Sequence, residues 1–168
     1  AARESGYRTE TLSWLRCLAD PTIVSKHAGP EDIVRIESPG ENTDVEEQLV
    51  RLGARCRGEV GSFSREFGRI ENSAHWFAGF QFMLRQFRSV QAKLPGARWM
   101  NSPDDIELMF DKSKCQQRLQ EHGVRVPEYL GTIHSFRELE AITDRARARR
   151  IFLKLPHSSS ASGVIAIQ

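Results

Sequence analysis

Hydrophobic and polar positions in the first part of the chain alternate between strand-like and helix-like patterns. Asp32–Ile36 is a β-branched run bounded by prolines, which predicts a short strand. Thr9–Leu15 has similar chemistry and predicts another strand, followed by a short helix that reaches Asp20. Strands and helices that alternate at this spacing usually build a parallel sheet with helices on its faces, so we expect an α/β fold.

Two longer segments carry helical periodicity. Thr43-x-x-Glu46 has the form of a capping box, and the apolar positions after it predict a helix that ends at Gly53. From Ser73 to Lys93 the large apolar residues recur at intervals of three and four, which predicts a long amphipathic helix. We interpret this stripe as core rather than as a cofactor surface; its members are Trp76, Phe77, Phe80, Met83, Leu84, Phe87 and Val90.

A cluster of helix-start signals follows. Arg98–Asn101 is a short strand by its position. Ser102 precedes a proline and two aspartates, a combination that predicts a capped helix start. A second helix is expected from Asp111 to His122, with Gly123 as its stop.

The remaining segment alternates again between helix and strand. Ser135-x-x-Glu138 is a further capping box that opens a helix to about Arg150. Ile151–Lys154 and Gly163–Gln168 are short apolar runs of strand type, separated by a loop rich in serine.

Composition narrows the class of protein. Hydrophobic residues make 39% and charged residues 27% of the 168 residues, which is typical of a globular chain. The net charge of +2 is too small to indicate a dedicated nucleic-acid binder. No apolar run approaches the ~18 residues of a membrane span. Three widely spaced cysteines favour free thiols over a disulfide or zinc framework, and we expect a cytoplasmic protein.

The loop between the last two strands is the first candidate site. Lys154 ends a strand and must place its ammonium group in a polar environment. The loop that follows offers hydroxyl groups and backbone N–H donors, and small residues let the main chain fold closely around an anion. A serine-rich turn with a surface lysine is the competing interpretation. The serines are Ser158, Ser159, Ser160 and Ser162, and the loop closes at Gly163.

The order of motifs in the second half resembles the ATP-grasp superfamily, the fold of glutathione synthetase and D-alanine–D-alanine ligase. The segment holds an Asp111-Lys112 pair opening a helix, then Gly123-Val-x-Val-Pro127, then a strand ending in Lys154 and a loop ending in Gly163. The resemblance covers about residues 101–168. It implies a pre-ATP-grasp domain with a small, Rossmann-like parallel sheet in residues 1–100. It also implies that residues 101–168 form the first ATP-grasp subdomain, an α+β unit with antiparallel strands.

The resemblance assigns roles to several residues. Lys112 and Lys154 would contact the phosphates of ATP, and Ser158, Ser159, Ser160, Ser162 and Gly163 would form the phosphate loop. The chain has only five lysines beside nineteen arginines, which adds weight to lysines at these two positions. Lys114 lies two residues beyond Lys112, so the choice between them depends on the Asp-Lys pair. Family loops are usually rich in glycine, whereas here no glycine lies between Lys154 and Gly163.

The resemblance implies that Mg²⁺ binds together with ATP. In the family, the Mg²⁺ ligands, the adenine pocket and most substrate contacts lie in the C-terminal half of the ATP-grasp fold. We therefore predict no metal ligands in this chain. It begins at Ala1 and ends within a predicted strand, so we expect a piece of a longer protein that is inactive alone.

A second candidate is the loop after the strand Asp32–Ile36, because open α/β sheets bind ligands at the carboxyl ends of their strands. Glu37, Ser38 and Gly40, together with Asn101, would form a substrate-side loop. An ordinary strand-to-helix turn is an equal alternative. The arginines of Arg145–Arg150 suggest nucleic-acid binding, but arginines at a helix end mostly complement its dipole and face solvent.

Together these features predict part of an ATP-dependent carboxylate–amine or carboxylate–thiol ligase. Its partners would be ATP and a small-molecule or peptide carboxylate, with no membrane and no nucleic acid; a homodimer is left open. In the family reaction a carboxylate attacks the γ-phosphate, and a nucleophile then takes the acyl group. The alternatives are a non-catalytic nucleotide- or small-molecule-binding module and an Arg-rich nucleic-acid-associated domain.

Overall fold

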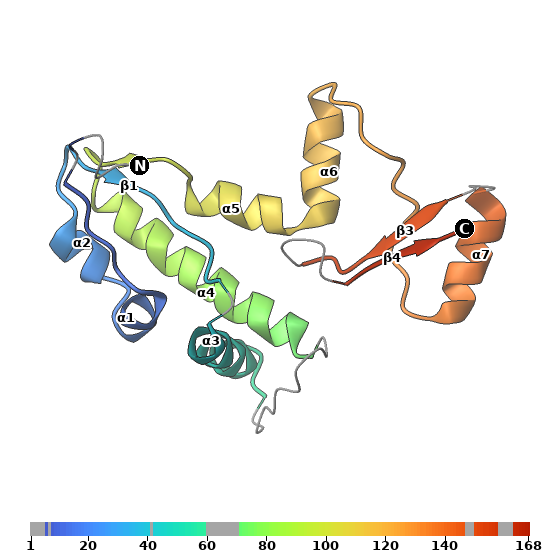
Figure 1. Cartoon of the computed structure of the whole chain (residues 1–168), viewed down its shortest axis with the longest axis horizontal. Helices are drawn as coiled ribbons and strands as arrows, with labels where there is room; N and C mark the ends of the chain where they lie inside the picture. The colour runs from blue at the N-terminus through green and yellow to red at the C-terminus, as the bar shows by residue number, and fades with distance from the viewer. Residues whose placement is uncertain (1–5, 7, 41, 60–70, 147–149, 158–162) are drawn as a thin grey trace. The chain divides into compact units, whose positions relative to one another are not determined.

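The computed structural model describes residues 6, 8–40, 42–59, 71–146, 150–157 and 163–168. The chain divides into two compact units, residues 1–107 and 108–168, and each is described by itself. Figure 1 shows helices together with short strands, which confirms the mixed α/β class in its coarse form. The Rossmann-like architecture and the domain boundary between residues 100 and 101 stay predictions. No helix in the described part of the chain is long and apolar enough to cross a membrane.

The first unit is mainly helical. Its helices are α1 (Trp14–Ala19), α2 (Ile23–His27), α3 (Thr43–Cys56), α4 (Ser73–Ala92) and the start of α5 (Pro103–Phe110). The long helix predicted over Ser73–Lys93 is therefore confirmed as α4. Its apolar stripe lies in the core as predicted, except that Trp76 is half-buried.

The core of this unit is the contact between α3 and α4. Leu49 on α3 and Leu84 on α4 are fully buried, and Phe80 and Met83 are almost fully buried. Gly53 and Gly79 bring the two backbones together, because a Cβ on Gly53 would lie 2.7 Å from the backbone nitrogen of Gly79. The prediction that Gly53 ends the helix is wrong. α3 continues to Cys56, and the glycine serves close helix packing instead.

Aromatic rings extend this core to α1. The ring of Trp14 lies 5.8 Å from Phe80 in a tilted arrangement and 5.6 Å from Phe87 edge-on. The ring of Trp76 also stacks on Phe80, with 5.1 Å between the ring centroids. Such ring pairs stabilise a core beyond their buried area.

The predicted strand over Thr9–Leu15 is wrong, because the chain is irregular up to Ser13 and helical from Trp14. Ser13 caps α1 by accepting a hydrogen bond from the backbone N–H of Arg16 at 3.3 Å. The capping box predicted at Thr43 is shifted by one residue. Asn42 is the cap, and its side chain accepts from the Val45 N–H at 3.1 Å.

A two-stranded parallel sheet joins distant parts of this unit. β1 (Ile33–Val34) pairs with β2 (Arg98–Trp99), so both predicted strands are present but shorter than expected. The side chain of Asn101 continues the pairing beyond β2. Its Oδ1 accepts from the Ile36 N–H at 3.0 Å, and its Nδ2 donates to the Ile36 carbonyl at 2.8 Å.

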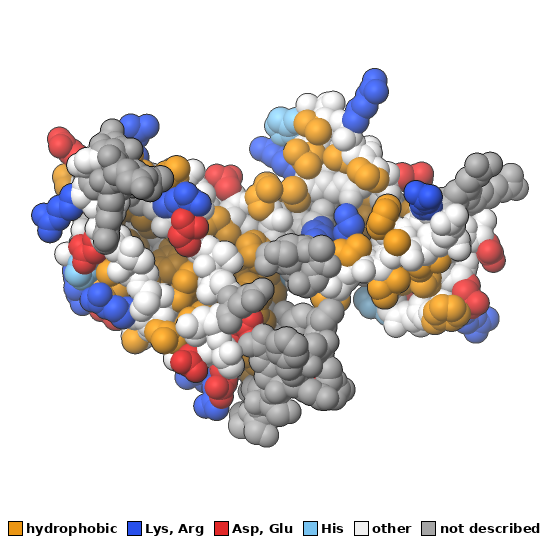
Figure 2. All heavy atoms as spheres, viewed as in Figure 1, with side chains coloured by type: hydrophobic (Ala, Val, Ile, Leu, Met, Phe, Trp, Pro, Cys, Tyr) orange, Lys and Arg blue, Asp and Glu red, His pale blue; other side chains and the backbone are white. Residues whose placement is uncertain are grey.

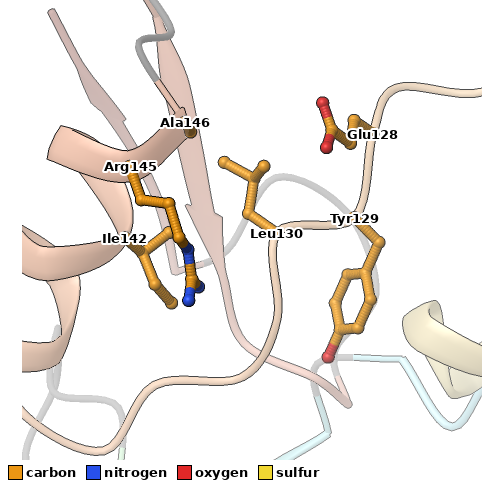
Figure 3. A pocket seen from close by; sticks show the side chains of 6 residues that line it. All are labelled: Glu128, Tyr129, Leu130, Ile142, Arg145 and Ala146. Atoms are coloured by element: carbon orange, nitrogen blue, oxygen red, sulfur yellow. The ribbon is translucent and has the colours of Figure 1, made fainter.

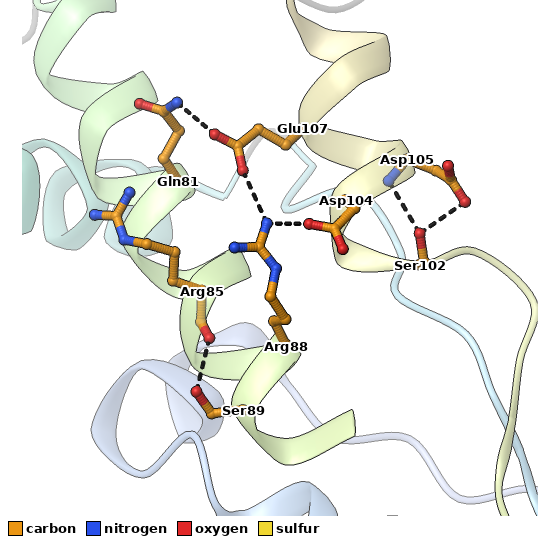
Figure 4. A network of polar contacts seen from close by, with 8 residues as sticks. All are labelled: Gln81, Arg85, Arg88, Ser89, Ser102, Asp104, Asp105 and Glu107. Atoms are coloured by element: carbon orange, nitrogen blue, oxygen red, sulfur yellow. Dashed lines mark hydrogen bonds and ion pairs between the residues drawn. The ribbon is translucent and has the colours of Figure 1, made fainter. Parts of the chain in front are cut away.

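The first turn of α5 is held to α4 by a polar network (Figure 4). Arg88 forms ion pairs with Asp104 and Glu107, and Glu107 also accepts a hydrogen bond from Gln81 at 2.7 Å. The predicted cap of α5 is confirmed, because the Ser102 hydroxyl accepts from the Asp105 N–H at 3.0 Å.

The second unit contains α6 (Lys112–Glu121), α7 (Phe136–Ala146), β3 (Ile151–Lys154) and β4 (Val164–Ile167). The two strands pair antiparallel, with Ile151 opposite Ile167 and Lys154 opposite Val164. The predicted antiparallel pair is thus confirmed, in a sheet separate from β1 and β2. The predicted starts of α6 and α7 are confirmed as well, whereas the C-terminal end predicted for α7 lies partly outside the described residues.

The second unit buries few of its described apolar side chains. Ile151 is its only buried hydrophobic residue among those that the structure describes, whereas Phe136 and Phe152 are 72% and 62% exposed. Figure 2 shows hydrophobic side chains at the surface around β3, β4 and α7. The two apolar runs thus form the expected strands, but most of their described side chains are not buried in a core.

Candidate functional site

The start of α6 is fixed by Asp111, the residue that caps the helix. Its Oδ1 accepts a hydrogen bond from the Lys114 backbone N–H at 3.1 Å, and its Oδ2 forms an ion pair with the Lys114 ammonium at 3.1 Å. The Asp111 side chain is only 14% exposed, whereas that of Lys114 is 71% exposed. Lys114 is therefore the lysine that balances the charge of Asp111.

Two backbone contacts join the start of α6 to the segment that follows β3. The Lys112 N–H donates to the Pro156 carbonyl at 3.1 Å. Asp111 and His157 form an isolated antiparallel bridge beside it. These contacts place the predicted phosphate lysines, Lys112 and Lys154, in the same part of the unit although they are far apart in the sequence. Figure 2 shows Lys or Arg side chains gathered where α6 begins.

The positive charge of Lys154 affects the titration of Lys112. Lys112 is half-buried, and its pKa lies below the ordinary value because burial penalises the charged form and because the Lys154 ammonium repels it. Lys154 itself is exposed at the end of β3. The two neighbouring lysines of α6 therefore differ in their surroundings: Lys112 is affected by the charge of Lys154, whereas Lys114 forms an ion pair with Asp111.

His157 lies within the same cluster. Burial lowers the pKa of its ring, and the positive charges of Lys112 and Lys114 lower it further against the opposing influence of Asp111. Burial alone would raise the pKa of Asp111, but the hydrogen bonds from the backbone and side chain of Lys114 and the charges of Lys114 and His157 together lower it. His157 was not predicted as a site residue; the signal in the sequence is its position three residues after Lys154.

Most of the predicted phosphate loop lies outside the described residues. These positions include Ser158, Ser159, Ser160 and Ser162. Gly163, the last residue of the predicted loop, is described and has a φ of 69°. Only glycine adopts this left-handed conformation readily, which accounts for its place just before β4.

The second candidate site also becomes a defined structure. Asn101 binds both backbone groups of Ile36, which places it beside Glu37 at the carboxyl end of β1. The Glu37 carboxylate pairs with Arg35 at 2.8 Å, and its carbonyl accepts from the Trp14 indole N–H at 3.0 Å.

The turn that follows is held by a hydrogen bond within the turn itself. The Ser38 hydroxyl accepts from the Gly40 N–H at 3.3 Å, and Gly40 has a φ of 73°. The polar groups of this second candidate site therefore bind the chain itself, as in an ordinary turn, and a substrate-side role for it stays a prediction.

A shallow depression of about 270 Å³ lies between α7 and the extended segment before it (Figure 3). Leu130 lies opposite Ile142 and Ala146, and the charged groups at its edge are Glu128 and Arg145. Nothing in the sequence pattern pointed to this depression. It holds none of the predicted site residues.

Comparisons of the chain with models of protein families, with curated proteins and with solved structures find no match. In the part of the chain that the structure describes, no group of three or more His, Cys, Asp or Glu side chains could hold a metal ion. The cluster that contains Lys112, Lys154 and His157 is therefore the candidate functional site.

Proposed function

We propose that this chain binds the phosphate groups of ATP through Lys112 and Lys154, as part of an ATP-dependent ligase of the ATP-grasp type. One observation carries the proposal: the Lys112 N–H donates to the carbonyl of Pro156, two residues after Lys154. This backbone contact brings the start of α6, with Lys112, to the segment that follows β3, which ends in Lys154. The positive charge of Lys154 also contributes to the lowered pKa of Lys112.

The repulsion between the two lysines gives a physical reason to expect an anion at this place. Like charges brought together in a half-buried position disfavour each other and the folded state. A polyphosphate carries several negative charges along a short chain and reverses the sign of that interaction. Compact ammonium groups suit this role because they offset the charge of phosphate without a fixed planar geometry.

The support from the backbone is equally direct. The hydrogen bond from Lys112 to Pro156 and the bridge between Asp111 and His157 fix the start of α6 against the segment after β3. The position of Lys112 relative to Lys154 is thus set by backbone groups, so replacing either side chain leaves the frame in place.

In the ligase reaction that the resemblance implies, a substrate carboxylate oxygen attacks the γ-phosphorus and ADP leaves. The product is an acyl phosphate, from which an amine or thiol displaces inorganic phosphate. Lys112 and Lys154 would neutralise and position the phosphate groups in this scheme. No group of described residues fits Mg²⁺, so we assign the metal no ligand here and derive no step through it.

Binding of ATP and of inorganic pyrophosphate to single variants tests the proposal. Lys112→Gln and Lys154→Gln should each weaken binding by roughly 1–3 kcal/mol, the scale of a charge-assisted contact. Lys93→Gln is the matched control, because Lys93 lies at the end of α4 in the other unit. Equal affinities for all three variants would show that the two lysines do not bind phosphate.

Salt provides a second check. Lys154 is exposed, so its contribution should fall as ionic strength rises from low to physiological values. The affinity of the unmodified chain should therefore decrease with added salt, and that of Lys154→Gln should decrease less. An affinity that is independent of salt in both would contradict an electrostatic site.

A further inference from the structure

We propose that Met109 and Cys115 form a binding site for one soft monovalent metal ion, of the class of Cu(I) and Ag(I). The Cys115 thiol Sγ lies 3.6 Å from the Met109 thioether Sδ, and both residues belong to the second unit. The proposal goes beyond the binding of ATP, because neither residue belongs to the predicted phosphate site.

The two sulfur atoms come from neighbouring helices. Met109 lies in the last turn of α5 and Cys115 in the first turn of α6. The Cys115 N–H donates to the Asp111 carbonyl at 2.8 Å, so the first turn of α6 fixes the position of this residue. The Met109 side chain is 64% exposed and Cys115 is half-buried. An ion from solvent can therefore reach the pair without opening the fold.

The separation of the two sulfur atoms suits a shared metal ion. Sulfur ligands lie at ~2.3 Å from a bound metal ion, so two of them 3.6 Å apart bind the same ion with a sulfur–metal–sulfur angle of about 100°. This angle is close to that of tetrahedral coordination. Without metal the thiol donates a weak hydrogen bond to the thioether, so the ligands already face each other.

The chemistry of the ligands selects the ion. Thiolate and thioether groups are soft ligands and favour Cu(I), whereas clusters of three or four His, Cys or carboxylate side chains hold Zn²⁺. Binding replaces the proton of the Cys115 thiol, which passes to solvent, so a monovalent ion leaves the net charge of the site unchanged. A divalent ion would add a positive charge beside Lys112 and Lys114, which lie in the same turn of α6.

Titration with Cu(I) in competition with the chelator bicinchoninate, in the presence of ascorbate and without oxygen, measures the affinity. Cys115→Ser and Met109→Leu should each weaken binding by at least about 10-fold, because even the loss of a group that only supports a metal ligand costs this much. Cys56→Ser and Met100→Leu are the matched controls. They remove an exposed thiol and a 66% exposed thioether elsewhere, and they should leave the affinity unchanged.

NMR of the methionine methyl groups separates a ligand from a structural residue. The chain has three methionines, so the resonances can be assigned by substitution. One equivalent of Cu(I), which is diamagnetic, should shift the Met109 methyl resonance and leave those of Met83 and Met100 in place. Cys115→Ser should abolish the shift at this metal concentration, and Zn²⁺ should not produce it. Circular dichroism checks that the helices are retained in each variant.

The outcomes are decisive in both directions. A shift confined to Met109, together with weaker binding by both site variants, supports the shared site. If Met109→Leu binds Cu(I) as tightly as the unmodified chain, the sulfur pair is only a hydrogen bond and the inference is wrong. Equal shifts at Met100 and Met109 would overturn it as well, because they show binding to any exposed sulfur. None of these variants changes Lys112 or Lys154, so the phosphate proposal is tested separately.

Discussion

Gly53 on α3 and Gly79 on α4 face each other at a helix contact that leaves no room for a side chain. A Cβ on Gly53 would lie 2.7 Å from the Gly79 nitrogen, and a Cβ on Gly79 would lie 3.1 Å from the Gly53 nitrogen. The first would also overlap the His75 carbonyl and the second the Leu49 carbonyl. Because the opposing atoms belong to the backbone, neither helix can yield locally, and the close packing of α3 on α4 depends on both glycines.

Gly53→Ala and Gly79→Ala should therefore each destabilise the first unit. Alanine favours a helix over glycine by about 1 kcal/mol, so an unhindered site would become more stable. Overpacking of a core costs typically 1–3 kcal/mol and more where backbone must move, so we expect a net loss of about 2 kcal/mol or more.

Tryptophan fluorescence during urea unfolding measures this effect. All three tryptophans, Trp14, Trp76 and Trp99, lie in the first unit, so the signal reports that unit alone. Ser89→Ala, at an exposed position of α4, is the control and should change stability by less than about 0.5 kcal/mol. A stabilising effect of alanine at Gly53 or Gly79 would contradict the packing described here.

Asn101 gives a second prediction in the same unit. Its side chain satisfies both backbone groups of Ile36, so Asn101→Ala should remove two hydrogen bonds and cost roughly 1–3 kcal/mol. Met100→Ala is the matched control, because the Met100 side chain is 66% exposed. Both can be compared by the same fluorescence measurement. Equal midpoints for the two variants would mean that the amide adds nothing to the sheet.

Local signals predicted the elements whose ends are set by the chain's own neighbours. Ser102 and Asp111 cap their helices as the sequence indicates, because a cap depends on residues within one turn. Gly53 was misread for the opposite reason. Glycine usually ends a helix, but here its lack of a side chain serves a contact with α4, which local sequence does not encode.

Strand lengths were overestimated for a related reason. Asp32–Ile36 has strand residues throughout, yet only Ile33–Val34 pairs as a strand with β2. The last pairing position is taken by the Asn101 side chain, which the strand pattern could not predict. The Thr9–Leu15 run shows the limit of composition alone, because Ser13 caps a helix within it.

Lys112 and Lys154 were named from the order of motifs, and their role in binding phosphate stays a prediction. The structure joins the backbone of Lys112 to that of Pro156, two residues after Lys154. Neither the pairing of Lys114 with Asp111 nor the place of His157 followed from the sequence, because both depend on the contact between the start of α6 and the segment after β3.

A third prediction concerns the cap of α6. Asp111→Ala should cost about 0.5–2 kcal/mol, because the Lys114 N–H loses its acceptor. Asp111→Asn keeps that acceptor and should cost much less, since the Lys114 partner is mostly exposed. Hydrogen exchange of the Lys114 amide is the measurement. Equal exchange in the two variants would show that the side chain does not cap the helix.

The stability of the α6 cap should also depend on pH, because the Asp111 carboxylate titrates in acid. Its pKa in the folded chain lies below the ordinary value of 3.8, so its stabilisation is complete above that value. It is lost as the pH falls through the lower folded pKa, where the carboxylate gains a proton. Protection of the Lys114 amide should therefore decrease in this acidic range in the unmodified chain but not in Asp111→Asn.

A fourth prediction concerns the charge of Lys112. Lys154→Gln should raise the pKa of Lys112 toward its ordinary value of 10.5, because one of the two causes of its lowering is removed. A lysine whose folded pKa is lowered destabilises the fold below that pKa, and the cost is relieved as the pH rises toward 10.5. The increase in stability over this alkaline range should be smaller in Lys154→Gln. An unchanged pKa of Lys112 would show that the two charges do not interact.

The most direct measurement of the central claim is an NMR titration of the lysine Cε resonances with inorganic pyrophosphate. The chain has five lysines, so each resonance can be assigned by substitution. If Lys112 and Lys154 form one phosphate site, their resonances should shift with the same half-saturation, while Lys26 and Lys93 stay in place. Uniform shifts of all five resonances, or none at Lys112 and Lys154, would contradict the account.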